Sequence, residues 1–176
     1  MYCLAVRIRK GEPSDASAVI ALLTAGIESY REFAPAGWQP PEVGPEEELV
    51  AERFLGDDRV WYVVAEDKQG HAGQCGFMPA HQRRNMKGDP VPGVAHFWQL
   101  FVRRDLWGGG LAADLHDRAI AAMRERGYTR ARLLTPVRQA RARAFYERRG
   151  WRESPFTVED AEPLAGLPVT EYKLEL

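Results

Sequence analysis

Three consecutive glycines, at positions 108–110, separate an apolar run that ends at Val102 from a helix-like stripe that begins at Leu111. Because glycine has no Cβ, the backbone of such a turn can approach a ligand closely. The first N–H groups of the following helix have no partner inside it, so they can bind phosphate. No Gly-Lys-Ser/Thr follows, Ala113 stands where a dinucleotide motif has its third glycine, and no acidic residue ends a following strand. The turn is therefore neither of these phosphate motifs. The turn indicates either an anion site of a different kind or an ordinary tight turn.

A second candidate for chemistry is the helix expected over Arg141–Arg149, which Gly150 ends. Ala142, Phe145 and Tyr146 follow helical spacing, so they share one face. That face buries the tyrosine ring and leaves its hydroxyl at a cleft, where the hydroxyl can give or take a proton. An ordinary core aromatic is the alternative interpretation.

The charge is unevenly distributed along the chain. Formal charges sum to −1, but residues 76–152 hold 16 basic and 6 acidic side chains, a net charge of +10. The flanking segments carry −6 over residues 1–75 and −5 over 153–176. A basic middle segment favours an anionic ligand, and the acidic flanks favour a compact one over a long polyanion. This balance disfavours nucleic acid as a partner of the arginine-rich helix.

Hydrophobic periodicity gives the elements that must position these segments. The fold class expected is α/β, with a mixed sheet that has helices on both faces, in the order β-α-α-β-β-β-α-β-α-β. A long loop is expected over His81–Gly93, and a further strand from Trp151 is left open. The strands are expected over Leu4–Ile8, Val60–Ala65, Ala72–Met78, Ala95–Val102, Arg130–Val137 and Thr170–Leu174, and the helices over 13–27, 46–55, 111–123 and 141–149.

Composition sets the class of protein. With 45% apolar residues in a chain of 176, a disordered or fibrous protein is excluded, and one domain over residues 1–176 is expected. Cys3 and Cys75 are too few for a disulfide framework, which fits a reducing cytoplasm. Cys75, on an expected strand, is interpreted as a small buried residue. No signal peptide or membrane span is expected. The histidines show no metal-ligand spacing, so no metal is expected.

The two segments together resemble the GNAT superfamily of N-acetyltransferases. The resemblance covers residues 96–151, and the expected element order agrees over nearly the whole chain. Trp107 departs from the family's Gln or Arg, which should matter little because that loop binds through its backbone, and Gln139 stands where Asn is common. The resemblance rests on Leu100-x-Val102, on Trp107-x-x-Gly110-x-Ala112 and on Phe145-Tyr146-Glu147-Arg148-Arg149-Gly150-Trp151.

The resemblance implies an enzyme that transfers the acetyl group of acetyl-CoA to a primary amine by direct attack, without a metal. It implies that the fourth and fifth strands part around acetyl-CoA, and that backbone groups near Leu100 polarise the thioester as an oxyanion hole. The second departure, at Gln139, would alter a hydrogen bond to the pantetheine arm. The implied cofactor-binding residues are Leu100, Phe101, Val102, Trp107, Gly108, Gly109, Gly110, Leu111, Ala112, Ala113, Gln139 and Tyr146.

Two side chains are candidates for proton transfer. The family's general acid, which protonates the leaving thiolate, matches Tyr146. An amine with a pKa near 10 must lose a proton before it attacks, and His96 is the candidate base because some family members have a catalytic glutamate near this position. A structural histidine is the alternative, with the proton leaving through water relayed from Glu28 or Glu32. Leu134 stands where a ribosomal-type group of the family has a glutamate, which counts against that subtype.

The acceptor is where inference from the sequence ends. A small-molecule amine is expected, with a protein or peptide amine as the alternative, and the acidic residues over 28–58 favour a cationic acceptor. Trp38 is a candidate to line the acceptor pocket or to pack in the core. A non-catalytic acyl-CoA sensor also fits the motifs. No membrane partner is expected, and a homodimer stays open because dimers are common in the family.

Overall fold

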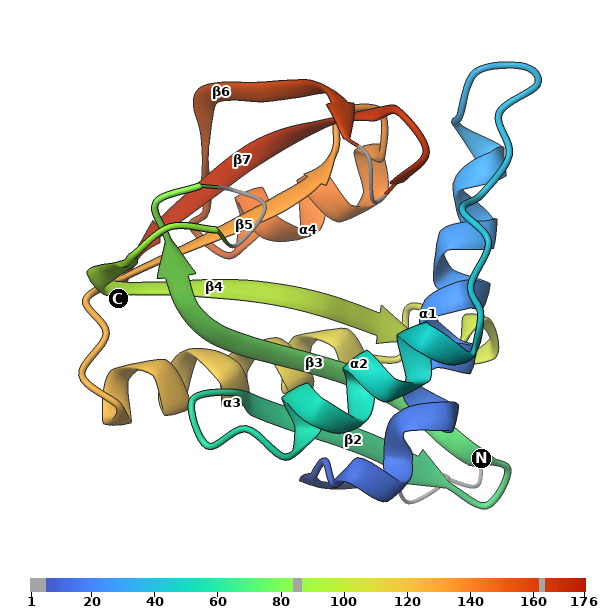
Figure 1. The fold of residues 1–176 in the computed structure, drawn as a ribbon, viewed down its shortest axis with the longest axis horizontal. Helices are drawn as coiled ribbons and strands as arrows, with labels where there is room; N and C mark the ends of the chain where they lie inside the picture. The colour runs from blue at the N-terminus through green and yellow to red at the C-terminus, as the bar shows by residue number, and fades with distance from the viewer. Residues whose placement is uncertain (1–5, 84–86, 162–163) are drawn as a thin grey trace.

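The computed structural model describes residues 6–83, 87–161 and 164–176, in which seven strands form one sheet (Figure 1). The order across the sheet is β1-β2-β3-β4-β5-β7-β6. Every neighbouring pair is antiparallel except β4 and β5, which are parallel. The strands are β1 (Arg7–Lys10), β2 (Trp61–Asp67), β3 (Gly70–His81), β4 (Pro90–Val102), β5 (Arg130–Pro136), β6 (Arg152–Ala161) and β7 (Leu167–Glu175). The mixed α/β fold expected from the sequence is confirmed.

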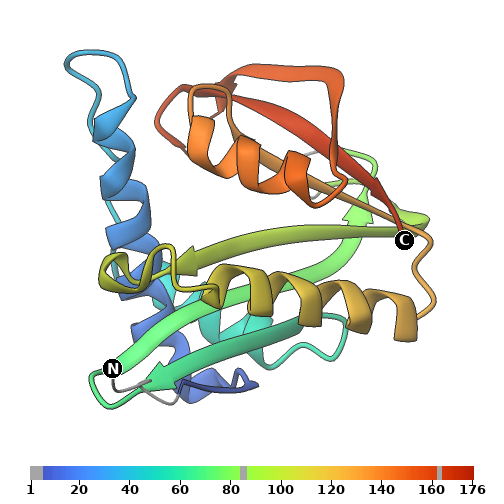
Figure 2. The same ribbon diagram turned by 180° about the vertical axis from the view of Figure 1, so that it is seen from behind.

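Four α-helices cover the two faces of this sheet. They are α1 (Ala16–Glu28), α2 (Pro45–Leu55), α3 (Leu111–Glu125) and α4 (Ala140–Arg148), with short 3-10 turns η1 (Pro13–Asp15), η2 (Ser29–Glu32) and η3 (Arg104–Leu106). In Figure 1, α1 and α2 lie in front of β2, β3 and β4, whereas α3 and α4 lie behind the sheet and come forward in Figure 2.

Alternation of side chains along the strands builds a separate core on each face. On β2, Val63 and Ala65 pack in the cluster that includes α3, and Tyr62 and Val64 pack in the cluster that includes α1 and α2. The α3 stripe predicted from the sequence, which includes Leu115, lies in the first cluster. Because helices cover both faces of the central strands, side chains that point to either face are buried. The sequences of these strands are therefore nearly continuous apolar runs.

The central feature of the sheet is the separation of β4 from β5. Their parallel pairing joins only Val94–His96 to Arg130–Arg132. Beyond that point β4 stays paired to β3 and β5 stays paired to β7, and the two strands diverge in both views (Figures 1 and 2). A bulge follows in β4, where Gln99 has φ of 57°, an uncommon conformation for a residue with a side chain. The strand parting implied by the family resemblance is thus present.

Helix α1 approaches the end of β4 closely. A Cβ built on Gly26 would lie 2.1 Å from Cδ1 of Phe101, so a larger residue at this position could not pack without a shift. Phe101 also packs against the cluster of Ile27, Tyr30 and Leu167. Helix α1 therefore reaches from the end of β4 to the start of β7, across the side where β4 and β5 part.

Some element boundaries differ from the expectations. Strand β4 begins at Pro90, five residues before Ala95, and β3 ends at His81, so both ends of the expected loop over His81–Gly93 are strand. Proline is tolerated at the first residue of a strand, which the sequence interpretation took as a sign of loop. The strand left open after Trp151 is present as β6. Cys3, with the first part of the expected strand Leu4–Ile8, lies outside the described residues.

Candidate active site

The glycine turn forms the N-terminal end of α3. Gly110 caps the helix with φ of 93°, and Gly108 has φ of 83°, a left-handed conformation that glycine adopts without strain. A Cβ at either position would meet nothing within 4 Å, so the turn has an open side. The N–H groups of Leu111–Ala113 make no backbone hydrogen bond within the described chain. The turn therefore presents free donors at the positive end of a helix of 15 residues, which suits a phosphate group.

Trp107, the first departure from the family motif, is held against the end of β4. Its indole Nε1–H donates to the carbonyl oxygen of Val102 at 2.7 Å. The guanidinium of Arg141, from the first turn of α4, stacks on the indole with its Cζ 4.0 Å from the ring centroid, and Arg104 lies 5.1 Å away. Two cations therefore stand beside the glycine turn, and Asp105 is neutralised by Arg103 at 2.7 Å.

Leu100, Phe101 and Val102 lie on the part of β4 that has left β5. Their pairing is with β3 alone, so one edge of this stretch has no strand beside it. Unpaired strand edges display N–H and C=O groups that bind an extended partner. The pantetheine arm of acetyl-CoA, which contains two amides, is such a partner. The three residues, the turn and Gln139 therefore fit the cofactor implied by the resemblance.

Gln139 is the N-cap residue of α4. Its side-chain oxygen accepts a hydrogen bond from Thr135 Oγ1 at 3.1 Å, which leaves its amide nitrogen as a donor. Gln139 thus lies between the end of β5 and the start of α4, across the gap between β4 and β5 from Leu100.

Tyr146 is buried in α4, with 9% of its surface exposed. Its ring packs against Phe145, Trp151 and Tyr172, at centroid distances of 5.4, 5.9 and 6.3 Å. Its hydroxyl makes no hydrogen bond with a described residue, and burial raises its pKa well above the ordinary value. The phenol therefore keeps its proton over the physiological range, as a general acid must.

His96 lies at the apex of the divergence, on the last residue pair that joins β4 to β5. It is buried, and its Nδ1 has no hydrogen-bond partner in the described part of the chain. Burial, followed by the positive charge of Arg132, lowers its pKa to about 3. The imidazole is therefore neutral at physiological pH, but it is a weak proton acceptor.

The acidic residues suggested for a water relay face outward. Glu28 forms an ion pair with Arg31, and Glu32 pairs with Arg104 at 2.6 Å, with about half of each carboxylate side chain exposed. Trp38 packs on the cluster of Ile27, Tyr30 and Leu167, and its Nε1–H donates to the carbonyl oxygen of Leu164 at 3.2 Å. Both of its suggested roles are compatible with this position.

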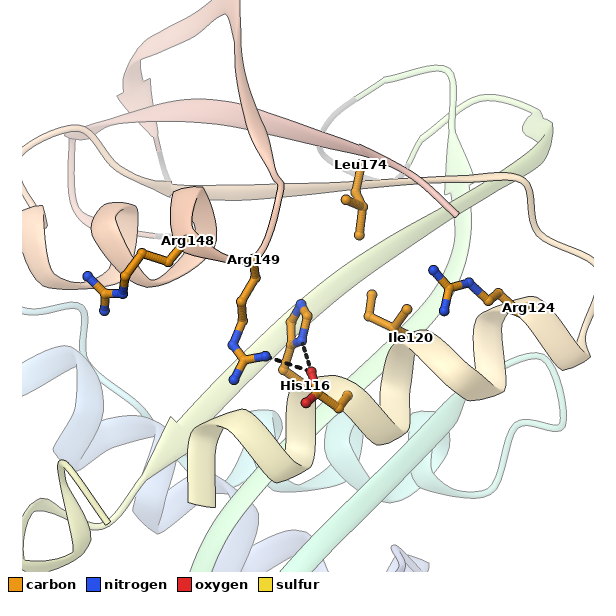
Figure 3. A pocket seen from close by; sticks show the side chains of 7 residues that line it. His116, Ile120, Arg124, Arg148, Arg149 and Leu174 are labelled. Atoms are coloured by element: carbon orange, nitrogen blue, oxygen red, sulfur yellow. Dashed lines mark hydrogen bonds and ion pairs between the residues drawn. The ribbon is translucent and has the colours of Figure 1, made fainter. Parts of the chain in front are cut away.

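A polar network fixes α4 against α3. The indole N–H of Trp151 donates to Nε2 of His116 at 2.9 Å, so the His116 proton lies on Nδ1, which donates to Asp117 at 2.9 Å. Asp117 also binds Arg149 at 2.7 Å. His116, Asp117 and Arg149 line a hollow between α3 and the end of α4 (Figure 3). The hollow lies beside the paired end of β4 and β5, away from the glycine turn. The network's role is therefore to hold Trp151, and with it the Tyr146 ring.

Two residues beside the parting of the strands were not selected from the sequence. Gln99 follows a buried run and carries no charge, and only its positive φ marks it; its Oε1 accepts a hydrogen bond from the Tyr62 hydroxyl at 2.8 Å. Tyr30 continues the helical stripe of Leu23 and Ile27 by three residues, a spacing that could have placed it on the buried face.

Comparison with known proteins agrees with this geometry. The model of the acetyltransferase (GNAT) family matches residues 23–151. The chain belongs to the GNAT family. No curated protein matches the sequence. This GNAT chain is similar in fold to a ribosomal-protein-alanine N-acetyltransferase from Brucella melitensis, with 19% identity, a TM-score of 0.74 and coverage of 97% of this chain and 99% of that one.

Two other solved structures show the same fold. A putative acetyltransferase from Acinetobacter baylyi has 14% identity and a TM-score of 0.75 over 100% of this chain and 95% of its own. YncA, a putative acetyltransferase from Salmonella typhimurium solved with its cofactor acetyl-CoA, has 16% identity and a TM-score of 0.73, covering 98% and 94%. The expected family and the expected class of enzyme, an acyltransferase, are confirmed for this GNAT protein.

Among the described residues of this GNAT chain, no group of three or more His, Cys, Asp or Glu side chains is placed to bind a metal ion. Over the same residues, no helix is both long and apolar enough to cross a bilayer. Cys75, as expected, is a buried free thiol.

We expect Gly110→Glu to weaken acetyl-CoA binding by more than about 100-fold, a loss of roughly 3 kcal/mol. The new side chain would place a negative charge at the anion-binding end of α3 and strain the backbone. Isothermal titration calorimetry measures the affinity. The matched control is Gly127→Glu, at the opposite end of α3, where φ is 81° and the space is equally open. Equal affinities for the two variants would contradict an anion site at the glycine turn.

Proposed function

We propose that the protein transfers the acetyl group of acetyl-CoA to a primary amine by direct attack. The observation that carries the proposal is the parting of β4 and β5, with the glycine turn after β4 and the helix that holds Tyr146 after β5. Acetyl-CoA supplies the activated thioester when bound. The YncA structure, which holds acetyl-CoA on the same fold, supports the choice of cofactor.

Binding of the cofactor is assigned to backbone groups on both sides of the gap. The free N–H groups at the start of α3 hold the pyrophosphate, and the unpaired edge of Leu100–Val102 holds the pantetheine arm. Arg141 stands beside the turn and adds positive charge. Because backbone groups do most of this work, Trp107 in place of Gln or Arg is compatible with binding.

Tyr146 is proposed as the general acid. As the new C–N bond forms and the C–S bond breaks, its phenol proton passes to the thiolate sulfur. With ordinary pKa values near 10 for the phenol and 8.5 for the thiol, this transfer costs about 2 kcal/mol. Burial raises the pKa of Tyr146. It also raises the pKa of a thiol in the same place, because burial disfavours the charged thiolate. The difference between the two pKa values therefore changes less than either value.

His96 is the candidate base from the sequence, but its buried environment limits its role. A group with a pKa of about 3 cannot hold a proton taken from an alkylammonium ion at neutral pH. We therefore infer that the acceptor loses one proton to water before the attack and reacts as the neutral amine. After the C–N bond forms, the nitrogen releases a second proton to water, and Tyr146 regains the proton that it gave to the sulfur. The neutral imidazole of His96 can accept a hydrogen bond at Nδ1, but it does not take up the proton of the amine.

A small-molecule amine is the proposed acceptor. A hydrogen bond from Trp38 to Leu164 joins the segment after η2 to the connection between β6 and β7. Leu134, in place of a glutamate, counts against the ribosomal subtype. A protein amine is the second candidate, because the Brucella melitensis structure is that of a ribosomal-protein-alanine N-acetyltransferase.

We expect acetyl-CoA-dependent release of free thiol when the protein is supplied with a panel of small primary amines, and peptides with a free N-terminus are the comparison. Thiol release with at least one small amine supports the proposal. Tight binding of acetyl-CoA without release on any amine would contradict it and would favour an acyl-CoA sensor.

In the same assay, Tyr146→Phe should lower kcat by about 10²-fold, the usual contribution of one proton-transfer group. Acetyl-CoA affinity should stay within twofold, because the ring and its packing are kept. Tyr128→Phe is the control, since that half-buried hydroxyl lies on the connection between α3 and β5. A Tyr146→Phe enzyme as fast as wild type would remove this residue from the mechanism.

The pH dependence of kcat/KM tests the base. His96 stays neutral above pH 5, so the rate should follow the neutral fraction of the amine and rise about tenfold per pH unit up to its pKa. His96→Gln should leave the shape of this profile unchanged. A wild-type inflection between pH 6 and 7 that His96→Gln abolishes would show that His96 does take the proton.

A further inference from the structure

His116 is a buried histidine whose two ring nitrogens both make hydrogen bonds. It lies in α3 with 3% of its surface exposed. Its Nε2 accepts a hydrogen bond from the indole N–H of Trp151 at 2.9 Å, and its Nδ1 donates to Asp117 at 2.9 Å. An indole N–H can only donate, so the bond to Nε2 requires a neutral imidazole. The bond between Trp151 and His116 therefore exists in only one protonation state of the histidine.

The ring of Trp151 connects His116 to Tyr146. Trp151 is 2% exposed, and its ring centroid lies 5.9 Å from that of Tyr146, with an angle of 64° between the planes. The His116 ring also packs edge-on against Phe97 of β4 and Phe145 of α4, both at 5.8 Å. Phe145 in turn packs against Tyr146 at 5.4 Å. Two routes of direct ring contact thus lead from one imidazole to the ring of Tyr146.

The charged groups beside His116 come from α3 and from the end of α4. They line the same hollow, and they are Asp117, Arg124, Arg148 and Arg149 (Figure 3). The strands present apolar side chains here, Phe97 of β4 against the ring and Leu174 of β7 in the hollow. Burial lowers the pKa of His116, Arg149 adds to this effect, and Asp117 opposes it. His116 is therefore neutral at physiological pH and gains a proton at a lower pH than an exposed histidine does.

We propose that His116 is a positioning residue for the transfer: its neutral imidazole holds Trp151, and Trp151 holds the Tyr146 ring in place to protonate the sulfur. This inference rests on the proposed acetyl transfer. Protonation of His116 would place a hydrogen on Nε2 that faces the indole N–H, and two donors cannot bond to each other. The acid form therefore releases Trp151 from α3 and loosens the ring of Tyr146. His116 acts through Trp151 and needs no contact with the reacting atoms.

A double-mutant cycle between His116 and Tyr146 in the thiol-release assay tests the link. His116→Leu fills the space with an apolar side chain but removes the acceptor of the indole N–H. In the wild-type background, kcat should therefore fall by about 3- to 10-fold. In the Tyr146→Phe background the same change should have less than about a twofold effect, because the hydroxyl that it positions is already gone. The acetyl-CoA Kd from calorimetry should be the same in all four proteins.

Two matched variants separate this role from general packing. His116→Gln keeps a side-chain oxygen that can accept the indole N–H, so kcat should stay within about twofold of wild type. Arg148→Gln changes a side chain that lines the same hollow but takes no part in the bonds to Trp151, so it should leave kcat as in wild type. If His116→Leu does not fold, Trp151→Phe takes its place in the cycle, because it keeps a ring beside Tyr146 and removes the indole N–H.

The protonation of His116 can be followed without any measurement of activity. In the ¹⁵N-labelled protein, the indole N–H resonance of Trp151 is assigned by its absence in Trp151→Phe. This resonance should shift as the pH falls below about 6.5, the ordinary pKa of histidine, because the bond to Nε2 is lost on protonation. It should not shift in His116→Gln, whose side chain takes up no proton.

An equal loss of kcat from His116→Leu with and without the Tyr146 hydroxyl overturns this proposal, because the histidine would then act only on the fold. An indole resonance of Trp151 that does not move before the protein unfolds in acid also overturns it. Absence of thiol release by wild type overturns the proposed transfer itself, and this role falls with it. The two failures are distinguishable because the first two outcomes are seen in a protein whose wild type releases thiol.

Discussion

The pairing of β4 with β5 extends over only three residues from each strand, and the rest of the site depends on where it stops. Parallel strands that continued in register would occupy each other's N–H and C=O groups. Because they part after His96 and Arg132, one edge of Leu100–Val102 is left without a strand. Each arm is held open by its other neighbour, β3 for β4 and β7 for β5. The gap is therefore built into the sheet and does not depend on a mobile loop.

The two faces of the sheet serve the gap differently. On the side of α3 and α4, the glycine turn offers free donors, and the network from Trp151 through His116 to Asp117 fixes the helix that carries Tyr146. On the side of α1 and α2, Gly26 lies against Phe101 at the end of β4, and Tyr30 of η2 packs with Leu167 at the start of β7. The face with α3 and α4 therefore carries the groups that we propose bind the cofactor and protonate its thiolate.

The sequence predicted the element order and the family because those depend on local patterns: the stripe on α3, the glycines before Leu111 and the helix end at Gly150. It also placed Tyr146 on a buried face correctly. It did not place Tyr30, although the spacing from Ile27 is that of a buried helix face, and it did not place Gln99, because a glutamine in an apolar strand carries no local signal of its contacts. Their positions follow from long-range contacts with Leu167 and Tyr62. The lowered pKa of His96 could not be predicted from the sequence either, because it arises from burial and from Arg132 on another strand.

The claim that the gap between β4 and β5 binds acetyl-CoA can be tested directly by titrating the ¹⁵N-labelled protein with acetyl-CoA and following the backbone amides by NMR. We expect the largest changes in chemical shift at Leu100–Val102 and Gly108–Ala113, with smaller changes at Gln139. Changes that avoid these residues and gather instead around His116, Arg124 and Arg149, in the hollow between α3 and α4, would contradict it.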